Sequence, residues 1–516
     1  MRGTWWREGV FYQIYPRSFQ DSNGDGIGDL PGITRRLDHL NDGSPLSLGI
    51  QAIWLSPFYR SPMRDFGYDV SDYRDVDPIF GTLDDFDHLL EEAHRRGIRV
   101  LVDLVPNHTS DQHPWFVASR SSRDDPKRNW YVWADPRRGG PPNNWRAVFG
   151  SAEKRSAWTL DPASGQYYLH HFLPEQPDLN WWNEDVRRAI DDVMRFWLDR
   201  GVDGFRIDVA HSLVKDQQLR DNPWLFAKRR PRRNWELDEV HDIHRRWRRV
   251  LDEYGDRMAV GEVSSRKLSN LVRYYGKDDE LHMPFNFNFL RQPWSAERFR
   301  GVVEEWERLL PPHAWPDYTL SNHDRSRAAS RYGPRRARVA ALMLLTLRGT
   351  PFIYYGEEIG VTDVPIPPER IVDVDGRDPE RTPMQWDATP NAGFTTGHPW
   401  LPLAPDAQAV NVAAQRDDPR SLFSFYRQLI RLRGGSPALR AGSYRTVASL
   451  TGVFAYVREA EGESYGVGLN FTDRTRRVVF ARPARLVLST SADRQGSAER
   501  GEFDLAPNEG IVARLD

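Results

Sequence analysis

The stretch GVDGFRIDVAH at residues 201–211 places an arginine and a carboxylate at alternate positions. We expect a short buried strand here, and because successive side chains of a strand alternate between its two faces, Arg206 and Asp208 should point the same way. A neighbouring guanidinium favours the ionised form of a carboxyl, which is the form that acts as a nucleophile. An isolated Arg-x-Asp pattern is more often a structural ion pair, so the interpretation depends on the rest of the chain.

Two further carboxylates lie at the ends of strand-like segments downstream. Glu262 lies in MAVGEV (258–263), and Asp324 ends YTLSNHD (318–324). Hydrolysis of a glycosidic bond needs two carboxyl groups, one to protonate the departing oxygen and one to meet the oxocarbenium-like carbon. Together with Asp208, these residues indicate acid–base and nucleophilic chemistry of this kind.

Eight short apolar segments recur along the chain, separated by amphipathic helical segments such as 83–97. They are VFYQIYP (10–16), AIWLSP (52–57), RVLVDLV (99–105), GFRID (204–208), MAVGEV (258–263), MPFNF (283–287), YTLSNHD (318–324) and PFIYYGEE (351–358). Buried strands that alternate with helices predict parallel βαβ units. Eight such units close into a (β/α)8 TIM barrel, an α/β fold whose active site forms where the strands end.

The spacing also predicts three domains. They are the barrel (1–107 and 177–437), a small inserted domain after the third strand that is rich in Trp, Pro, Gly and Asn (108–176), and a C-terminal antiparallel β-domain of the β-sandwich type (438–516). A long loop dense in Pro and Asp is expected at about 359–400. A helix over 421–435 should end the barrel at two glycines.

Composition restricts the classes of function. The 516 residues carry a formal net charge of −2, so no overall field favours nucleic acid or an anionic membrane. The chain has no cysteine, which excludes disulfides, thiolate metal sites and thiol nucleophiles. The N-terminus has no apolar signal region, and no window approaches 18 consecutive apolar residues. We therefore expect a soluble, cytoplasmic protein without a nucleic-acid or membrane partner.

Several motifs in a fixed order resemble the signature regions of the alpha-amylase superfamily of glycoside hydrolases. They are DLVPNHTS (103–110), GFRIDVAH (204–211), GEV (261–263) and LSNHD (320–324), with the secondary motifs QPDLN (176–180), GIQAIWLSPFY (49–59) and GTPFIYYGEE (349–358). The segment GRDPERTPMQWD (376–387) is similar to the one that marks the exo-acting α-glucosidase and oligo-1,6-glucosidase branch. The resemblance spans residues 10–435.

The resemblance implies a role for each of the three acids. Asp208 would be the nucleophile that forms a glucosyl ester, and Glu262 the acid that protonates the leaving group and then the base that activates water. Asp324 would bind the 2- and 3-hydroxyls of the sugar. Because the family retains the anomeric configuration, the two catalytic carboxyls should lie about 5–5.5 Å apart.

The same resemblance implies a glucose site with a closed end, where Asp65 binds the 4- and 6-hydroxyls and Tyr68 stacks on the ring. The other expected substrate-binding residues are His108, Phe149, Phe172, Gln176, Arg206, His323 and Arg377. A closed end implies that short oligosaccharides lose one terminal glucose at a time. Asp103 is expected to orient Arg206, and His211 either bounds the aglycone site or satisfies the start of a helix.

The loop DSNGDGIGD at 21–29 places oxygen donors at alternate positions, as an EF-hand loop does, but Gly32 stands where that loop has its bidentate glutamate. A Gly- and Asp-rich turn is the simpler alternative. Because the branch that the chain resembles carries one structural ion at this motif, we expect one Ca²⁺ or Mg²⁺ for stability and no cofactor for catalysis. The expected ligands are Asp21, Asn23, Asp25, Ile27 and Asp29.

Two questions stay open: which glycosidic linkage is cleaved, and whether water or another sugar accepts the glucosyl group. Valine after the nucleophile, here Val209, goes with α-1,6 cleavage in this branch, but the two residues that follow differ from the usual Ile–Asn. An α-glucosyl transferase or sucrose isomerase on the same scaffold is an alternative, because Arg325 and Arg327 follow Asp324. A non-catalytic relative, such as the ectodomain of an amino-acid transporter heavy chain, is disfavoured because all three acids are present. The expected partner is an oligosaccharide, bound by a monomer or homodimer.

Overall fold

The computed structural model describes residues 5–150, 156–223, 233–491, 494, 497–498 and 500–516. Its central sheet has eight parallel strands in the order β11-β10-β9-β5-β2-β1-β13-β12. Their bounds are β1 Phe11–Ile14, β2 Ala52–Leu55, β5 Arg99–Leu104, β9 Gly204–Ile207, β10 Met258–Gly261, β11 Met283–Pro284, β12 Asp317–Thr319 and β13 Thr350–Tyr354. All eight predicted strands are present, and the predicted (β/α)8 barrel is confirmed.

The first and last strands in the sheet order, β11 and β12, meet at a seam. The backbone amide of Asn286, just after β11, donates a hydrogen bond to Asp317 Oδ1 of β12 at 3.1 Å. A side-chain oxygen therefore accepts the amide proton at this point, where a backbone carbonyl would accept it in a regular ladder. The sheet is nearly closed into a barrel.

The alternation of side chains along the strands divides the apolar core into two. Residues that point into the barrel form one cluster, in which the rings of Phe11 and Phe352 lie 4.6 Å apart. Residues that point outward form a larger cluster with the helices, and Phe205 and Ile207 belong to it. Arg206, which lies between these two, therefore points into the barrel, as the alternation predicts.

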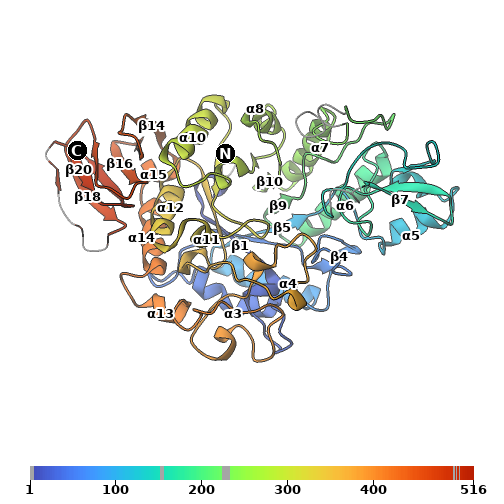
Figure 1. Cartoon of the computed structure of the whole chain (residues 1–516), viewed down its shortest axis with the longest axis horizontal. Coiled ribbons are helices and arrows are strands. Elements are labelled where there is room, and N and C mark those ends of the chain that lie inside the picture. The colour runs from blue at the N-terminus through green and yellow to red at the C-terminus, as the bar shows by residue number, and fades with distance from the viewer. Residues whose placement is uncertain (1–4, 151–155, 224–232, 492–493, 495–496, 499) are drawn as a thin grey trace.

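Amphipathic helices surround the barrel (Figure 1). They include α3 Leu30–Leu40, α4 Leu83–Arg95, α6 Glu184–Asp199, α7 Val240–Glu253, α10 Ala296–Leu309, α12 Pro334–Thr346 and α14 Leu422–Gly434. Local sequence sets where they begin. At the start of α4, the Thr82 hydroxyl accepts the amide of Asp85, and the Asp85 carboxylate accepts the amide of Thr82, which is a capping box. Helix α14 begins after its cap Ser421 and ends at Gly434, which confirms the predicted helix.

A glycine lets β9 and β10 lie against each other. A Cβ atom at Gly204 would lie 2.2 Å from the carbonyl oxygen of Met258, so a larger residue does not fit without a shift of backbone. The two residues are partners in the parallel ladder, and Ile207 pairs with Gly261 at its other end. This register brings the residues that follow the two strands, Asp208 and Glu262, to the same edge of the barrel.

Two segments over the barrel have short elements only. Between β5 and α6, the chain forms α5 Pro114–Ser121 and an antiparallel sheet in the order β6 Trp133–Ala134, β8 Gln166–Leu169 and β7 Trp158–Asp161. This region lies on the opposite side of the barrel from the C-terminal strands (Figure 1). The second segment is a hairpin of β3 Tyr59–Arg60 and β4 Asp72–Val76, which the sequence analysis missed because β3 is only two residues long.

The C-terminal region is antiparallel, as predicted. Its larger sheet contains β14 Ser443–Val447, β15 Val453–Ala460, β16 Glu463–Asn470, β21 Gly510–Leu515, β18 Ala484–Ser489 and β19 Ser497–Ala498, and its smaller sheet pairs β17 Arg476–Val479 with β20 Glu502–Leu505. One apolar cluster contains residues of both sheets. The predicted domain boundaries stay predictions.

In the described part of the chain, no helix has both the length and the apolar character that spanning a bilayer requires.

Candidate active site

Asp208, Glu262 and Asp324 line one cavity of about 180 Å³. Asp208 directly follows β9 and Glu262 directly follows β10. Arg206 Nη1 donates to Asp208 Oδ1 at 2.8 Å, and Arg206 Nη2 donates to Glu262 Oε2 at 2.6 Å. The predicted contact between Arg206 and Asp208 is present, and the structure adds Glu262 as a second partner of the same guanidinium.

At Asp208, burial outweighs the attraction of Arg206. Burial raises the pKa of Asp208 well above its ordinary value, Arg206 opposes this shift, and the nearby carboxyls of Glu262 and Asp103 add to it. Arg206 Nη1 also donates to Asp103 Oδ1 at 2.8 Å, so three carboxyls surround one guanidinium. The neighbouring Glu262 carboxyl is thus one cause of the raised pKa of Asp208.

Asp324 has the opposite character. Burial favours its neutral form, but His323, Arg377 and Arg381 outweigh burial and hold the pKa of Asp324 well below its usual range. Its Oδ1 accepts hydrogen bonds from Arg377 Nη1 at 3.1 Å and from Arg381 Nη2 at 3.0 Å. A permanently ionised carboxylate is a strong acceptor for sugar hydroxyls.

An ion pair joins two of the residues that line the cavity. Arg377 Nη2 donates to Asp65 Oδ1 at 2.7 Å across a separation of 312 residues. Asp65 lies between β3 and β4, and Arg377 lies in the predicted loop at 359–400, which consists of irregular chain and short 3-10 turns. The Arg377 guanidinium lies 4.8 Å above the ring of Phe149, whose centroid is 5.3 Å from that of Phe172.

The two histidines expected in the glucose site are neutral. Burial lowers the pKa of His323 to about 3 and that of His108 to about 4. A neutral imidazole has one donor and one acceptor nitrogen, which suits contact with hydroxyls. Gln13 Nε2 lies 2.7 Å from His323 Nδ1, so the ring proton is on Nε2, which donates to the Tyr68 hydroxyl at 2.7 Å.

Seven of the nine expected substrate-binding residues line the cavity: Asp65, Tyr68, His108, Phe149, Phe172, His323 and Arg377. Gln176 and Arg206 are not among the lining residues, and their contact with the sugar stays a prediction. Gln176 is fully buried, and its Nε2 donates to Asp65 Oδ2 at 2.9 Å and lies 3.1 Å from His108 Nε2. Both residues hold lining side chains from behind and are positioning residues.

Other lining residues escaped the sequence analysis or were left open. Val148, Ser264 and Asp375 line the cavity, and no sequence signal marks them. Trp235 also lines it, and only the high aromatic content hinted at such a residue. Its ring lies 4.8 Å from that of His211, which also lines the cavity.

The two arginines that follow Asp324 have different surroundings. Arg325 lines the cavity. Arg327 is buried, and its Nη1 donates to the carbonyl of Tyr355 at 2.5 Å. Arg327 therefore does not belong to the cavity wall.

The loop at 21–29 is closed by hydrogen bonds between its own residues. Asp21 Oδ1 accepts the amide of Asn23 at 2.9 Å, Asn23 Oδ1 accepts that of Asp25 at 2.8 Å, and Asp25 Oδ1 accepts that of Ile27 at 2.8 Å. Asp29 Oδ1 caps α3 by accepting the amide of Gly32 at 2.6 Å. The described residues contain no cluster of three His, Asp or Glu side chains that would hold a metal. An ion would therefore also need the Asn23 amide and Ile27 carbonyl oxygens, a hard-oxygen donor set that fits Ca²⁺.

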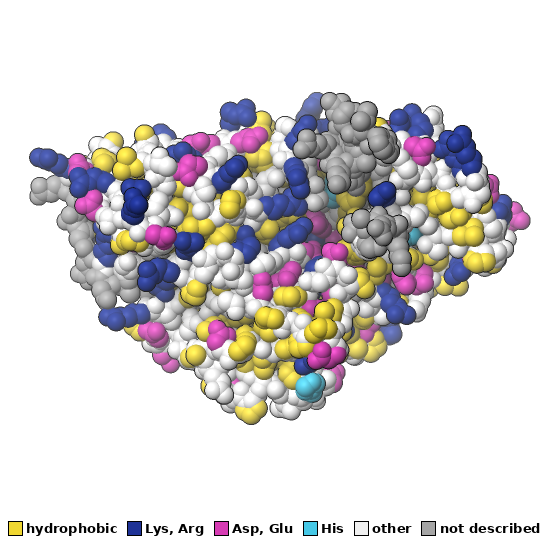
Figure 2. All heavy atoms as spheres, in the orientation of Figure 1, with side chains coloured by type: hydrophobic (Ala, Val, Ile, Leu, Met, Phe, Trp, Pro, Cys, Tyr) yellow, Lys and Arg dark blue, Asp and Glu magenta, His cyan; other side chains and the backbone are white. Residues whose placement is uncertain are grey.

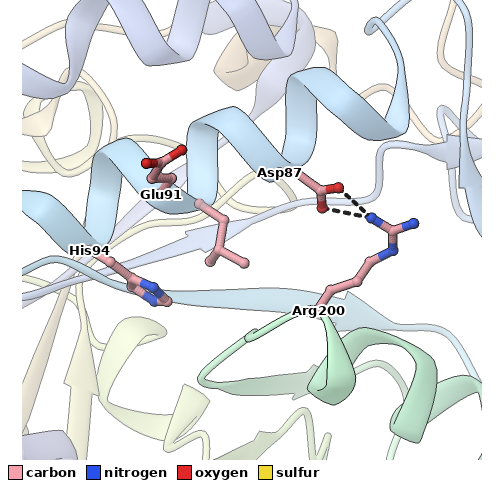
Figure 3. Close-up of a pocket in the computed structure, with 5 residues that line it drawn as sticks. Asp87, Glu91, His94 and Arg200 are labelled. Atoms are coloured by element: carbon pink, nitrogen blue, oxygen red, sulfur yellow. Dashed lines mark hydrogen bonds and ion pairs between the residues drawn. The ribbon is translucent and has the colours of Figure 1, made fainter.

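A separate depression lies on the outside of the barrel, between α4 and the end of α6 (Figure 3). It is lined by Asp87, Leu90, Glu91, His94 and Arg200. Arg200 Nη1 donates to both carboxylate oxygens of Asp87 at 2.6 Å, and His94 Nε2 lies 2.6 Å from Asp203 Oδ2. Because Arg200 and His94 are already paired, we assign this depression no part in the chemistry.

Comparison with known proteins agrees with this geometry. Residues 13–442 match the family described as "Alpha amylase, catalytic domain". A protein named "Probable alpha-glucosidase" from Rhizobium meliloti is 44% identical over 504 residues, which cover 91% of this chain and 90% of the relative. An "Oligo-1,6-glucosidase" from Parageobacillus thermoglucosidasius is 39% identical, with full coverage of both chains. The crystal structure of the "alpha-glucosyl transfer enzyme, XgtA" superimposes with a TM-score of 0.92 at 42% identity and covers 99% of both chains. The chain belongs to the alpha-amylase family of glycoside hydrolases.

Proposed function

We propose that this protein is a retaining exo-α-glucosidase that hydrolyses terminal α-linked glucose from short oligosaccharides. The observation that carries the proposal is the joint placement of Asp208 and Glu262 on one guanidinium, in a cavity whose far end is closed by Asp65 and Arg377. The relatives named as α-glucosidase and oligo-1,6-glucosidase support it.

In the first half-reaction, Asp208 attacks the anomeric carbon and forms a glucosyl ester. The bond between that carbon and the glycosidic oxygen breaks, and the oxygen takes the proton of Glu262, so the aglycone leaves as an alcohol. These roles require an anionic Asp208 and a protonated Glu262 when the substrate is bound.

In the second half-reaction, the Glu262 carboxylate takes a proton from water while the water oxygen attacks the anomeric carbon. The ester bond to Asp208 breaks, glucose leaves with its configuration retained, and Glu262 is protonated again. Asp324 accepts hydrogen bonds from the sugar hydroxyls, and these bonds strengthen as the ring flattens towards the transition state.

The closed end explains the proposed exo-action. The ion pair of Asp65 and Arg377, with Phe149 against it, leaves no passage for a sugar beyond the terminal glucose. We therefore expect maltose, isomaltose and maltotriose to be hydrolysed and long amylose to be a poor substrate.

The proposed function is tested by the products and by the covalent intermediate. Proton NMR of the reaction with 4-nitrophenyl α-glucoside should show α-glucose as the first product, and 5-fluoro-α-D-glucosyl fluoride should label the peptide that contains Asp208. Asp208→Asn should fold normally and lower kcat by about a thousandfold or more. A first product of β configuration, or a label on another residue, would overturn the proposal.

Transfer of glucose to an acceptor other than water is the second candidate. The similarity to the α-glucosyl transfer enzyme and the place of Arg325 on the cavity wall favour it. A time course with sucrose and with maltose separates the two functions, because a transferase forms new disaccharides or trisaccharides before free glucose accumulates.

We further propose that one Ca²⁺ or Mg²⁺ binds at residues 21–29 and stabilises the fold, with no cofactor in catalysis. The proposed ligands are the five residues predicted from sequence, and three of them already supply closing hydrogen bonds in that loop. We also propose that the enzyme works in the cytoplasm and that it is a monomer or homodimer. Light scattering on the purified protein would measure the oligomeric state.

A further inference from the structure

Three arginine side chains gather where the cavity opens beside Glu262. Arg325 lines the cavity, and Arg291 Nη2 donates to Oγ of the lining residue Ser264 at 3.4 Å. Arg266 and Arg325 both act on Arg291 through their charge. Arg266 and Arg325 are exposed. Figure 2 shows Lys and Arg side chains gathered along one side of the central hollow.

Unlike the other charges of the cavity, these arginines form no salt bridge with a carboxylate in the part of the chain that the structure describes. Glu262 acts on Arg291 only through its charge, without an ion-pair contact. By contrast, Asp208 and Glu262 bind Arg206, and Asp324 binds Arg377. Burial and the two neighbouring arginines lower the pKa of Arg291. The positive charges of Arg325 and Arg266 therefore repel the charged form of Arg291. A bound anion would remove that repulsion.

The arginines lie on the side from which the aglycone departs. Glu262 protonates the glycosidic oxygen in the proposed mechanism, and the charge of Glu262 also acts on Arg291. The glucose end of the cavity lies elsewhere, at Asp65 and Arg377. The leaving group therefore occupies the space that the three arginines border.

We propose that this aglycone subsite selects a negatively charged leaving group, namely a sugar phosphate or a sugar acid. This inference rests on the proposed α-glucosidase function and names the substrate class of the same site. Guanidinium groups bind phosphate and carboxylate through two parallel hydrogen bonds, and Arg325 and Arg291 are placed to do so, while Arg266 adds to the positive field. Hydrolysis yields glucose and the anion as an alcohol.

The first test compares kcat/KM within two matched pairs of substrates. Maltose is compared with maltobionate, in which the same α-1,4-linked glucose is attached to gluconate, and trehalose is compared with trehalose 6-phosphate. The anionic member of at least one pair should be preferred by about tenfold or more, and added NaCl should reduce the preference. The pair that shows the preference identifies carboxylate or phosphate as the recognised group. A ratio of one or less in both pairs overturns the proposal.

The second test removes single charges. Arg291→Gln and Arg325→Gln should each lower the ratio of anionic to neutral kcat/KM by about fivefold or more. Arg249→Gln is the matched control, because Arg249 is exposed on α7 outside the cavity lining. If the control lowers the ratio as much as the two variants do, the net charge of the protein causes the preference and the subsite is wrong.

A binding measurement separates this proposal from the proposed function. Calorimetry on Asp208→Asn compares the Kd of maltobionate and trehalose 6-phosphate with those of their neutral counterparts. If the wild type hydrolyses none of the four sugars but this variant binds an anionic one about tenfold more tightly, the function fails and the anionic subsite stands. If maltose is hydrolysed with no preference in either measurement, the subsite alone fails.

Discussion

Arg206 Nη2 donates a hydrogen bond to Glu262 Oε2 at 2.6 Å, although the two residues lie 56 positions apart. The same guanidinium binds Asp208 through Nη1. Both proposed catalytic carboxyls thus lie in contact with one permanent cation. At Asp208, burial and the neighbouring carboxyls of Glu262 and Asp103 raise the pKa despite that cation.

The raised pKa of Asp208 predicts where activity is lost in acid. Asp208 must be ionised to attack, so kcat/KM falls as the pH falls through that pKa. The acid limb should therefore lie well above the pH of about 3.9 at which an ordinary aspartate titrates. A pH profile with 4-nitrophenyl α-glucoside, whose leaving group needs little acid assistance, measures it. Glu262→Gln removes one neighbouring carboxyl and should move the limb to lower pH. A wild-type limb near pH 4 would contradict a raised pKa of Asp208.

The proposed acid role of Glu262 predicts a dependence on the leaving group. Glu262→Gln should lower kcat/KM for maltose by about 10²- to 10⁴-fold, because the sugar alkoxide needs a proton to depart. The loss should be far smaller for 2,4-dinitrophenyl α-glucoside, which leaves unprotonated. Steady-state kinetics on both substrates provides the comparison. An equal loss on the two would remove the acid role.

Val209, next to Asp208 on the cavity wall, predicts a change in linkage preference. It is a β-branched residue with a φ of 43°, a strained conformation that the surrounding turn maintains. Val209→Thr keeps the branching and the strain and adds only a hydroxyl. We expect the ratio of isomaltose to maltose hydrolysis to fall by several-fold. Val148→Thr, elsewhere on the wall, is the comparison variant. An unchanged ratio in Val209→Thr would show that residue 209 does not set the linkage preference.

Asp317 predicts a pH dependence of stability that is separate from catalysis. Burial raises the pKa of Asp317 well above its ordinary value, and the one hydrogen bond from Asn286 offsets this only in part. The folded protein therefore holds a proton here that the unfolded chain releases above about pH 3.9, so this contribution to stability is lost as the pH rises. Asp317→Asn cannot ionise, and its gain in Tm over wild type should be larger at pH 8 than at pH 5.

The exposed Asp406 provides the control for Asp317. Asp406→Asn removes a carboxylate that is exposed to water in the folded state, so its effect on Tm should be the same at both pH values. If the two variants respond to pH alike, Asp317 is not protonated in the folded protein.

The proposed ion at residues 21–29 predicts a loss of stability on chelation. EDTA should lower the Tm by several degrees and leave kcat at a low temperature unchanged, because a ligand bound only to the folded state stabilises it. Added Ca²⁺ should restore the Tm. Asp25→Asn should reduce the effect of EDTA, since it removes one charged ligand. An unchanged Tm, with no metal detected by elemental analysis, would leave the loop as a turn closed by its own hydrogen bonds.

Local patterns predicted much of the fold correctly. Each barrel strand is a short apolar run that its own composition marks, and the start of α4 follows from Thr82 and Asp85 alone. The β3–β4 hairpin was missed, because a two-residue strand has no periodicity to detect. Gln176 was assigned to the sugar, but only the folded chain shows Asp65 and His108 between it and the cavity.

The amino-acid sequence by itself determined the eight strands, the order of the motifs and the common face of Arg206 and Asp208, because these depend on neighbours within a few residues. Only the tertiary structure decided that Asp65 and Arg377 pair on the cavity wall, which charges Arg206 shares, and that Arg266 and Arg325 lie near enough to Arg291 to repel it. The reason is physical: these contacts join distant segments whose separation is set by barrel closure and loop packing. The direction of a pKa shift likewise depends on how completely folding removes water from the carboxyl.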